Sequence, residues 1–234
     1  MEQENPLRIL LVVNLPWDSR LGAVRIYMEL AEQWRASGHV VAQYSLSDAF
    51  PGVRASSAVF ALRQLLFSYK AAAFVRKNGA RFDVVDALIG VLPFSKSRLG
   101  FRGLLVARSV GLYRLYERFD RSVEKRWPGR PKGKFLGRIF YAFARRRLHH
   151  ASEQAVLHAD LINLPNQEEA GCLRQETKAD LPILVQPYGL TAERRQAFVQ
   201  AATAAEIRLA QKRICFIGMW SARKGARDWS TIIR

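Results

Sequence analysis

A glycine and an arginine near the N-terminus stand where a strand would pass into a helix. Gly22 lies in the turn after the apolar run 8–14, and Arg25 follows one turn into a helical pattern. A glycine there lets backbone N–H groups approach an anion at a helix N-terminus, and the Arg25 guanidinium could reach a phosphate or an anionic acceptor. The plainer interpretation stays open: Gly22 makes a tight turn, and Arg25 is a solvated helix residue.

Two ionisable side chains belong to strand-like runs further along the chain. Asp86 lies in the run 83–88, and Arg108 ends the run 104–108. We place both at the carboxyl ends of parallel strands, which is where open α/β sheets bind ligands. We therefore predict that Asp86 and Arg108 share one edge of a single sheet, near Gly22, and line an acceptor site.

The sequence offers little support for a metal site, a phosphate-binding loop, a serine nucleophile or a disulfide framework. The histidines at 149, 150 and 158 lack a Cys or carboxylate pattern with metal-ligand spacing, so we expect no metal. The sequence has no Gly-rich phosphate loop and no Gly-x-Ser-x-Gly elbow. Its two cysteines, Cys172 and Cys215, do not suggest a disulfide framework, which favours a reducing compartment.

Short strand-like runs alternate with longer helical patterns along most of the chain. Strands are predicted from apolar, branched runs at 8–14, 39–46, 83–88, 104–108, 161–164, 183–186 and 213–217. Helices are predicted at 23–37, 57–77, 135–158, 167–176 and 191–211, with another starting at 228. Gly38 falls at a helix C-terminus, and the stretch 113–134 reads as irregular. The order predicts an α/β fold with a Rossmann-like doubly wound parallel sheet.

The same pattern suggests how the chain is divided. We predict an N-terminal domain over 1–190, a helical linker over 191–212, and the opening of a second domain over 213–234. A lone strand cannot bury itself. Either the chain therefore continues in nature, or the strand 213–217 joins the first sheet.

Charge is the most unusual bulk property, with a net +17. The segment from Arg118 to Arg147 holds eleven basic residues against Asp120 and Glu124, with aromatic residues between them. Such a surplus favours an anionic partner. A peripheral membrane surface suits the mixture of basic and apolar residues, and nucleic acid is the weaker alternative because no recognisable scaffold accompanies the charges. No apolar run approaches the about 20 residues of a membrane span, so we expect a cytoplasmic protein, peripheral at the inner membrane face.

Six segments, taken in order, resemble the family 4 retaining glycosyltransferases of the GT-B fold. The resemblance runs the length of the chain, as the N-terminal domain and the start of the C-terminal one. It rests on the opening 8–38 with His39-Val40-Val41, on Asp83-Val84-Val85-Asp86, on Ala107-Arg108-Ser109-Val110-Gly111-Leu112, on Ala159-Asp160-Leu161-Ile162 with Glu168, on Val185-Gln186-Pro187-Tyr188-Gly189-Leu190, and on Phe216-Ile217-Gly218 with Lys224-Gly225.

The resemblance implies transfer of a hexose, with retention of configuration, from a nucleotide sugar to a glycan or lipid-linked acceptor in cell-surface polysaccharide synthesis. It implies no cofactor beyond that donor. Lys224, assisted by Arg223, would contact the donor pyrophosphate, because a compact ammonium suits a phosphate whose charge grows as the glycosidic bond breaks. The acceptor would be held by residues of the first domain: Gly22, Arg25, Asp86, Arg108 and Ser109.

Two positions depart from the family pattern. Met219 stands where the family usually has a second phosphate-binding Arg, and Val110 stands where it often has His. Valine offers no hydrogen bond. The family's Glu-rich donor motif would lie beyond Arg234, so we expect the chain alone to be an inactive fragment that transfers no sugar. The alternative function is a non-catalytic basic module that binds nucleic acid or membrane.

Overall fold

A computed structural model describes residues 5–52, 57–126, 135–177, 181–205, 221, 225–226 and 228–232. The chain divides into two compact units, one of Met1–Arg114 with Lys132–Pro187 and one of Leu115–Pro131 with Tyr188–Arg234. The first unit holds the sheet. The predicted domain boundaries at 190 and 212 remain a prediction.

A six-stranded, wholly parallel sheet forms the centre of the first unit, in the order β2-β1-β3-β4-β5-β6. The Rossmann-like doubly wound sheet is therefore confirmed, and each strand coincides with a predicted run to within two residues. The strands are β1 (Arg8–Val13), β2 (Val40–Ser45), β3 (Val84–Leu88), β4 (Leu104–Arg108), β5 (Leu161–Leu164) and β6 (Ile183–Val185).

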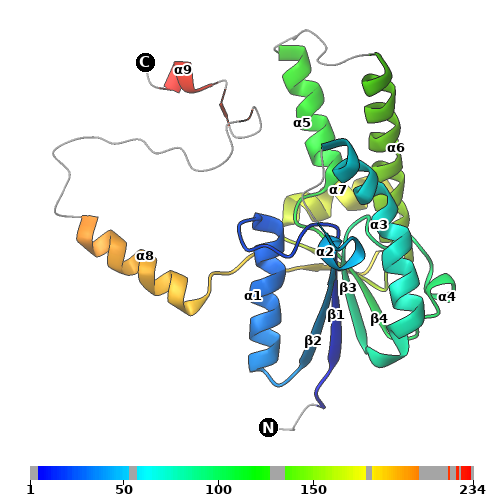
Figure 1. Cartoon of the computed structure of the whole chain (residues 1–234). Coiled ribbons are helices and arrows are strands. Elements are labelled where there is room, and N and C mark those ends of the chain that lie inside the picture. The colour runs from blue at the N-terminus through cyan, green and yellow to red at the C-terminus, as the bar shows by residue number, and fades with distance from the viewer. Residues whose placement is uncertain are drawn as a thin grey trace. The chain divides into compact units, whose positions relative to one another are not determined.

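Helices cover both faces of this sheet because successive strand residues point to opposite sides. Ile9, Leu11 and Val13 pack with Tyr27 and Ala31 of α1 (Gly22–Ala36) on one face. The alternate residues of β1, Leu10 and Val12, pack in a cluster with α3 (Ser57–Asn78) on the other. Figure 1 shows α1 and α3 on opposite sides of the strands. The remaining elements of this unit are α2 (Leu46–Ala49), the 3-10 turn η1 (Gly79–Arg81), α4 (Lys96–Leu99), α6 (Phe135–His158) and α7 (Gln167–Thr177).

Local chemistry explains where two of these elements begin and end. Gly38 follows the end of α1 with φ +90, a left-handed conformation that glycine adopts without strain, as predicted. At the start of α2, Ser45 and Asp48 form a reciprocal capping box, which satisfies N–H groups that a helix end leaves unpaired.

The short helices α2 and α4 and the longer helix α5 (Tyr113–Arg126) were missed by the sequence analysis. The residues 113–126, expected to be irregular, form α5. Its dense charge hides the apolar period, and none of its residues is buried. An ion pair between Arg121 and Glu117, four residues apart at 2.9 Å, is of the kind that supports an exposed helix.

The second unit contains most of α5 together with α8 (Ala192–Ala205) and the short α9 (Trp229–Ile232). α8 lies within the predicted helix 191–211, and its role as a linker between domains stays a prediction. The predicted strand 213–217, Met219, Arg223 and Lys224 lie outside the described residues. Within the described part of the chain, no helix is both long and apolar enough to span a bilayer.

Candidate functional site

The sheet register places Asp86 and Arg108 on the face that α1 covers. Asp86 lies beside Val106, and Arg108 lies beside Leu88, a residue that packs into the α1 cluster. Because β3 continues to Leu88, Asp86 sits in the middle of its strand. Its predicted place at the carboxyl end is therefore wrong, whereas Arg108 does end β4.

Asp86 and Arg108 nevertheless meet, because the Arg108 side chain turns back along the sheet. Its Nε donates to Asp86 Oδ2 at 2.9 Å, and its Nη2 donates to the same oxygen at 2.6 Å. The two side chains are only 2% and 6% exposed. Burial raises the pKa of the Asp86 carboxyl, and the charge and hydrogen bonds of Arg108 oppose that shift.

The pair contacts the end of α1 rather than its beginning. The Arg108 guanidinium lies 5.9 Å from the ring of Trp34, in the last turn of the helix, while Gly22 opens the first turn. The prediction that the pair lies near Gly22 is therefore wrong. In this arrangement the two side chains order the middle of the sheet, and their binding of an acceptor stays a prediction.

Ser109 anchors the loop that follows β4. Its hydroxyl donates to Glu169 Oε2 at 2.7 Å and accepts from the Gly111 N–H at 3.0 Å. Glu169 also interacts with the backbone of Leu112 and the side chain of Asn166. Burial raises the pKa of Glu169, and these hydrogen bonds oppose the rise. The carboxylate thus ties the loop 109–112 to the start of α7, at the carboxyl edge of the sheet.

Glu169 is a residue that the sequence analysis overlooked in favour of its neighbour. Glu168, which the family motif singled out, is exposed, and Glu169 is buried. The helical period carried the signal: Glu169 precedes Cys172 and Leu173 by three and four residues, and all three are buried on one side of α7.

Gly22 and Arg25 lie at the carboxyl edge, as predicted, and both are exposed. A Cβ added to Gly22 would meet nothing within 4 Å, so no close packing requires a glycine there. Arg25 Nε donates to the carbonyl of Ser19 at 2.8 Å, which holds the guanidinium against the loop that precedes α1. Their contact with an acceptor stays a prediction.

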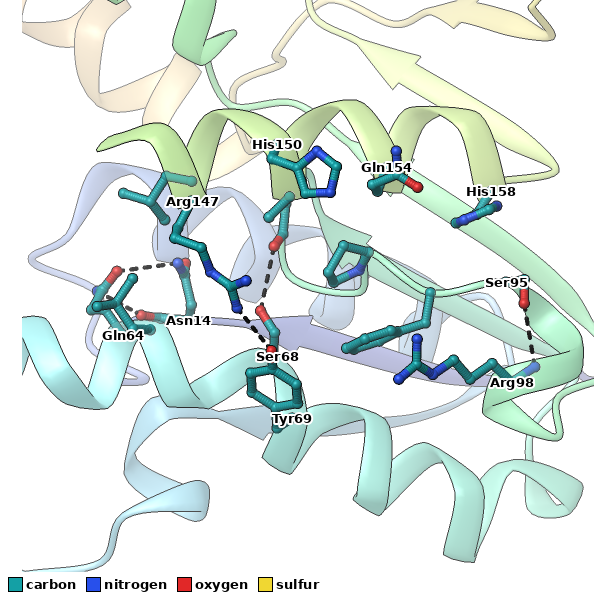
Figure 2. A pocket seen from close by; sticks show the side chains of 16 residues that line it. Asn14, Gln64, Ser68, Tyr69, Ser95, Arg98, Arg147, His150, Gln154 and His158 are labelled. Atoms are coloured by element: carbon teal, nitrogen blue, oxygen red, sulfur yellow. Dashed lines mark hydrogen bonds between the residues drawn. The ribbon is translucent and has the colours of Figure 1, made fainter. Parts of the chain in front are cut away.

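A pocket of about 280 Å³ opens between α3 and α6. Asn14, which directly follows β1, and Gly90, which comes two residues after β3, both line it. The strand order reverses between these two strands, and such a switch point is where doubly wound sheets bind ligands. Figure 2 shows Gln64, Ser68 and Tyr69 of α3 facing Arg147, His150 and Gln154 of α6 across this space. We name it the α3–α6 pocket; none of the predicted acceptor-binding residues lines it, whereas Arg147 of the predicted basic segment does.

A second hollow, of about 310 Å³, lies among Ile89, the loop after β4, α6 and α7. Its one arginine, Arg114, is paired with two carboxylates: it contacts Glu153, and its Nη1 lies 2.6 Å from Glu176. The two carboxylates therefore neutralise the positive charge of Arg114 in this hollow.

The predicted donor contacts, Arg223 and Lys224, lie outside the described residues, so their role stays a prediction. Among the residues that the structure describes, no three His, Cys, Asp or Glu side chains gather as metal ligands would.

Comparisons with known proteins identify no family. No family model matches the chain, and no curated protein matches it. Among solved structures, Phytolacca americana UGT2 complexed with UDP-2fluoro-glucose and pterostilbene aligns with a TM-score of 0.41 and 12% sequence identity. The alignment covers 83% of this chain and 57% of that one, so this chain spans little more than half the length of that protein. A likeness of that degree assigns no ligand to this chain.

Proposed function

We propose that this chain carries the acceptor-side domain of a retaining glycosyltransferase. The observation that carries the proposal is the α3–α6 pocket, which begins at Asn14 and Gly90, where the order of the parallel strands reverses. Six motifs in family order support the same assignment. Together they favour a domain that presents a small polar substrate from the carboxyl edge of its sheet.

In the proposed reaction the bond between the sugar and the nucleoside diphosphate breaks, and a bond to an acceptor oxygen forms. Arg223 and Lys224 offset the negative charge that grows on the departing diphosphate. The acceptor, a glycan or lipid-linked sugar of cell-surface polysaccharide synthesis, is bound at the carboxyl edge of the sheet, where the α3–α6 pocket begins at Asn14 and Gly90 and where Gly22 and Arg25 also lie. Ser109, held by Glu169, keeps the loop after β4 in place at that edge.

Transfer is tested with the complete product of the gene that encodes this sequence. A labelled nucleotide sugar and glycan or prenyl-phosphate acceptors should yield a product with the anomeric configuration of the donor, read by proton NMR. Lys224→Met should lower the transfer rate about 100-fold or more, because it removes one charge that stabilises the transition state.

The matched control is Lys77→Met, which alters an exposed lysine at the end of α3 and should leave the rate unchanged. A product of inverted configuration would contradict the retaining assignment. Equal rates for Lys224→Met and the unmodified protein would contradict the donor contact.

A second candidate function, peripheral membrane binding, is supported by an exposed apolar stripe on α3. The stripe consists of Val59, Leu62, Leu66 and Tyr69, which recur at three- and four-residue spacing and are 43–51% exposed. Most amphipathic helices turn such a face inward, whereas this one leaves it in solvent.

Basic residues of α6 lie beside this stripe. The two helices are in contact, and Arg147 Nη2 donates to the Tyr69 hydroxyl at 2.8 Å. Phe143, one turn earlier on α6, is 56% exposed. A cation near an anionic bilayer contributes about 1 kcal/mol, so α3 and the arginines at 145–147 of α6, which belong to the same unit, together suit an anionic lipid surface.

Vesicle co-sedimentation tests this surface. Binding should increase with the phosphatidylglycerol content and fall with salt, and the double variant Leu62→Gln/Leu66→Gln should weaken it several-fold by removing apolar contact. Val40→Gln, at a residue 61% exposed on β2, is the matched control and should bind normally. Binding to a mixed-sequence oligonucleotide but not to vesicles would overturn the membrane assignment in favour of nucleic acid.

A further inference from the structure

The α3–α6 pocket carries positive charge that no described carboxylate offsets. Arg98 and Arg147 are among its described lining residues, and none of those residues is Asp or Glu. Within the described part of the chain, neither arginine forms an ion pair. Other arginines of the same unit do find carboxylates, as Arg108 and Arg114 show. A concave site that keeps two unneutralised guanidinium groups is suited to an anionic group, which arginine binds through paired N–H donors.

An aromatic surface links the two arginines. The Arg98 guanidinium lies 5.1 Å from the centre of the Phe94 ring, and the Phe94 and Tyr69 rings are 5.9 Å apart. Tyr69 then accepts a hydrogen bond from Arg147 at 2.8 Å. Figure 2 shows Arg98, Tyr69 and Arg147 along the pocket. Aromatic rings offer a rigid apolar area, against which the C–H face of a sugar ring can pack.

Neutral polar groups complete the lining. Gln64 and Asn14 are joined by two hydrogen bonds, one of 3.2 Å between their side chains and one of 2.8 Å from Gln64 to the Asn14 carbonyl. Gln154 and His150 face the same space from α6. Amide and imidazole groups both donate and accept, as the recognition of sugar hydroxyls requires. The volume, about 280 Å³, is at the lower end for small-ligand pockets and admits about one sugar ring with one anionic substituent.

We propose that the α3–α6 pocket binds a phosphorylated saccharide, with the sugar ring against Phe94 and Tyr69 and the phosphoryl group at Arg147, beside Tyr69, while Arg98, beyond Phe94, adds attraction from the other end. The inference rests on the proposed transferase function and deepens it, because it makes the acceptor a sugar that bears a phosphoryl group. Two sources share this chemistry: a soluble sugar phosphate and the sugar phosphate headgroup of a lipid.

Calorimetric titration of the 234-residue chain at low salt tests the proposal. Glucose 1-phosphate, glucose, inorganic phosphate and a short-chain prenyl-phosphate glucose are the probes. Glucose 1-phosphate should bind at least tenfold more tightly than glucose or inorganic phosphate, because only it engages both the arginines and the rings. Tighter binding of the prenyl-linked probe supports a lipid source, and equal or weaker binding of that probe supports a soluble one.

Variants separate this pocket from general surface charge. Arg147→Gln should weaken the binding of glucose 1-phosphate about tenfold, since it loses a charge-assisted contact. Arg98→Gln, at the other end of the aromatic surface, should weaken this binding less. Arg102→Gln, at an exposed residue outside both the pocket and the basic segment 118–147, removes the same charge and should leave the affinity within twofold. Phe94→Leu should lower the affinity for glucose 1-phosphate and leave the affinity for inorganic phosphate unchanged.

The result that overturns the proposal is no binding of any probe, or an equal loss of affinity in Arg102→Gln and Arg147→Gln. Neither outcome bears on transferase activity, which the Lys224→Met assay reports separately. Conversely, specific binding of glucose 1-phosphate in a protein that transfers no sugar would leave the pocket assignment standing and remove the proposed function.

Discussion

Replacing Arg108 with methionine should lower the free energy of unfolding by about 3–5 kcal/mol, because it leaves the Asp86 carboxylate buried without its counter-charge. Asp86 and Arg108 are 1% and 5% exposed in the centre of the sheet, so water cannot replace the lost partner. Urea denaturation followed by circular dichroism at neutral pH measures the change.

The expected loss also depends on pH in a defined direction. Burial already raises the pKa of Asp86 against the opposing effect of Arg108, and removing Arg108 removes that opposition. A carboxyl whose pKa is higher in the folded state than in the unfolded state binds more protons when folded, so stability falls as pH rises above the unfolded value. Arg108→Met should therefore be least harmful in mildly acidic buffer and most harmful at neutral pH.

The double variant Asp86→Val/Arg108→Met tests whether the loss comes from the stranded charge. It replaces the ion pair with apolar side chains, and such replacements of buried pairs are often neutral or stabilising. We expect it to be more stable than Arg108→Met alone, with a coupling free energy of about 1–3 kcal/mol. If the changes in the free energy of unfolding caused by the two substitutions simply add, the loss in Arg108→Met does not come from breaking the Asp86–Arg108 ion pair.

Replacing Gly103 with alanine should destabilise the sheet by about 3 kcal/mol, at the upper end of the usual cost of overpacking. A Cβ at this position would lie 2.2 Å from the carbonyl oxygen of Asp83 and 2.6 Å from the Phe101 ring. That carbonyl accepts a hydrogen bond from the Leu104 N–H at 2.9 Å, at the point where β3 and β4 begin to pair. The neighbouring backbone cannot move away without breaking this bond.

Gly171→Ala is the matched control for this substitution. Gly171 lies inside α7, and an added Cβ there would meet nothing within 4 Å. Alanine is favoured over glycine in a helix by about 0.5–1 kcal/mol, so this variant should be as stable as the unmodified chain or more stable. Thermal unfolding of Gly103→Ala and Gly171→Ala, measured side by side, checks both expectations. If Gly103→Ala unfolds at the same temperature as the unmodified chain, the backbone near Asp83 accommodates the added Cβ and the expectation is wrong.

Most of the fold could be predicted from local sequence patterns. The runs 104–108 and 161–164 match β4 and β5 to the residue, because apolar, branched residues bounded by turn residues specify a buried strand wherever they occur. Gly38 was placed correctly after α1 because the left-handed conformation of a helix C-terminus favours glycine. α5 escaped detection because charged and aromatic residues obscure its period.

The candidate site was harder to predict because its contacts join distant parts of the chain. The sequence by itself determined the strands, most of the longer helices, their order, the parallel sheet and the surplus of positive charge, since each follows from neighbours in the chain. Only the tertiary structure decided that Arg108 turns back to Asp86 across 22 residues, that Ser109 bonds to Glu169 across 60, and that Arg147 reaches Tyr69 across 78. These partners are set by strand register and by the packing of α6 against α3, and a shift of one residue in register reverses the face to which every strand side chain points.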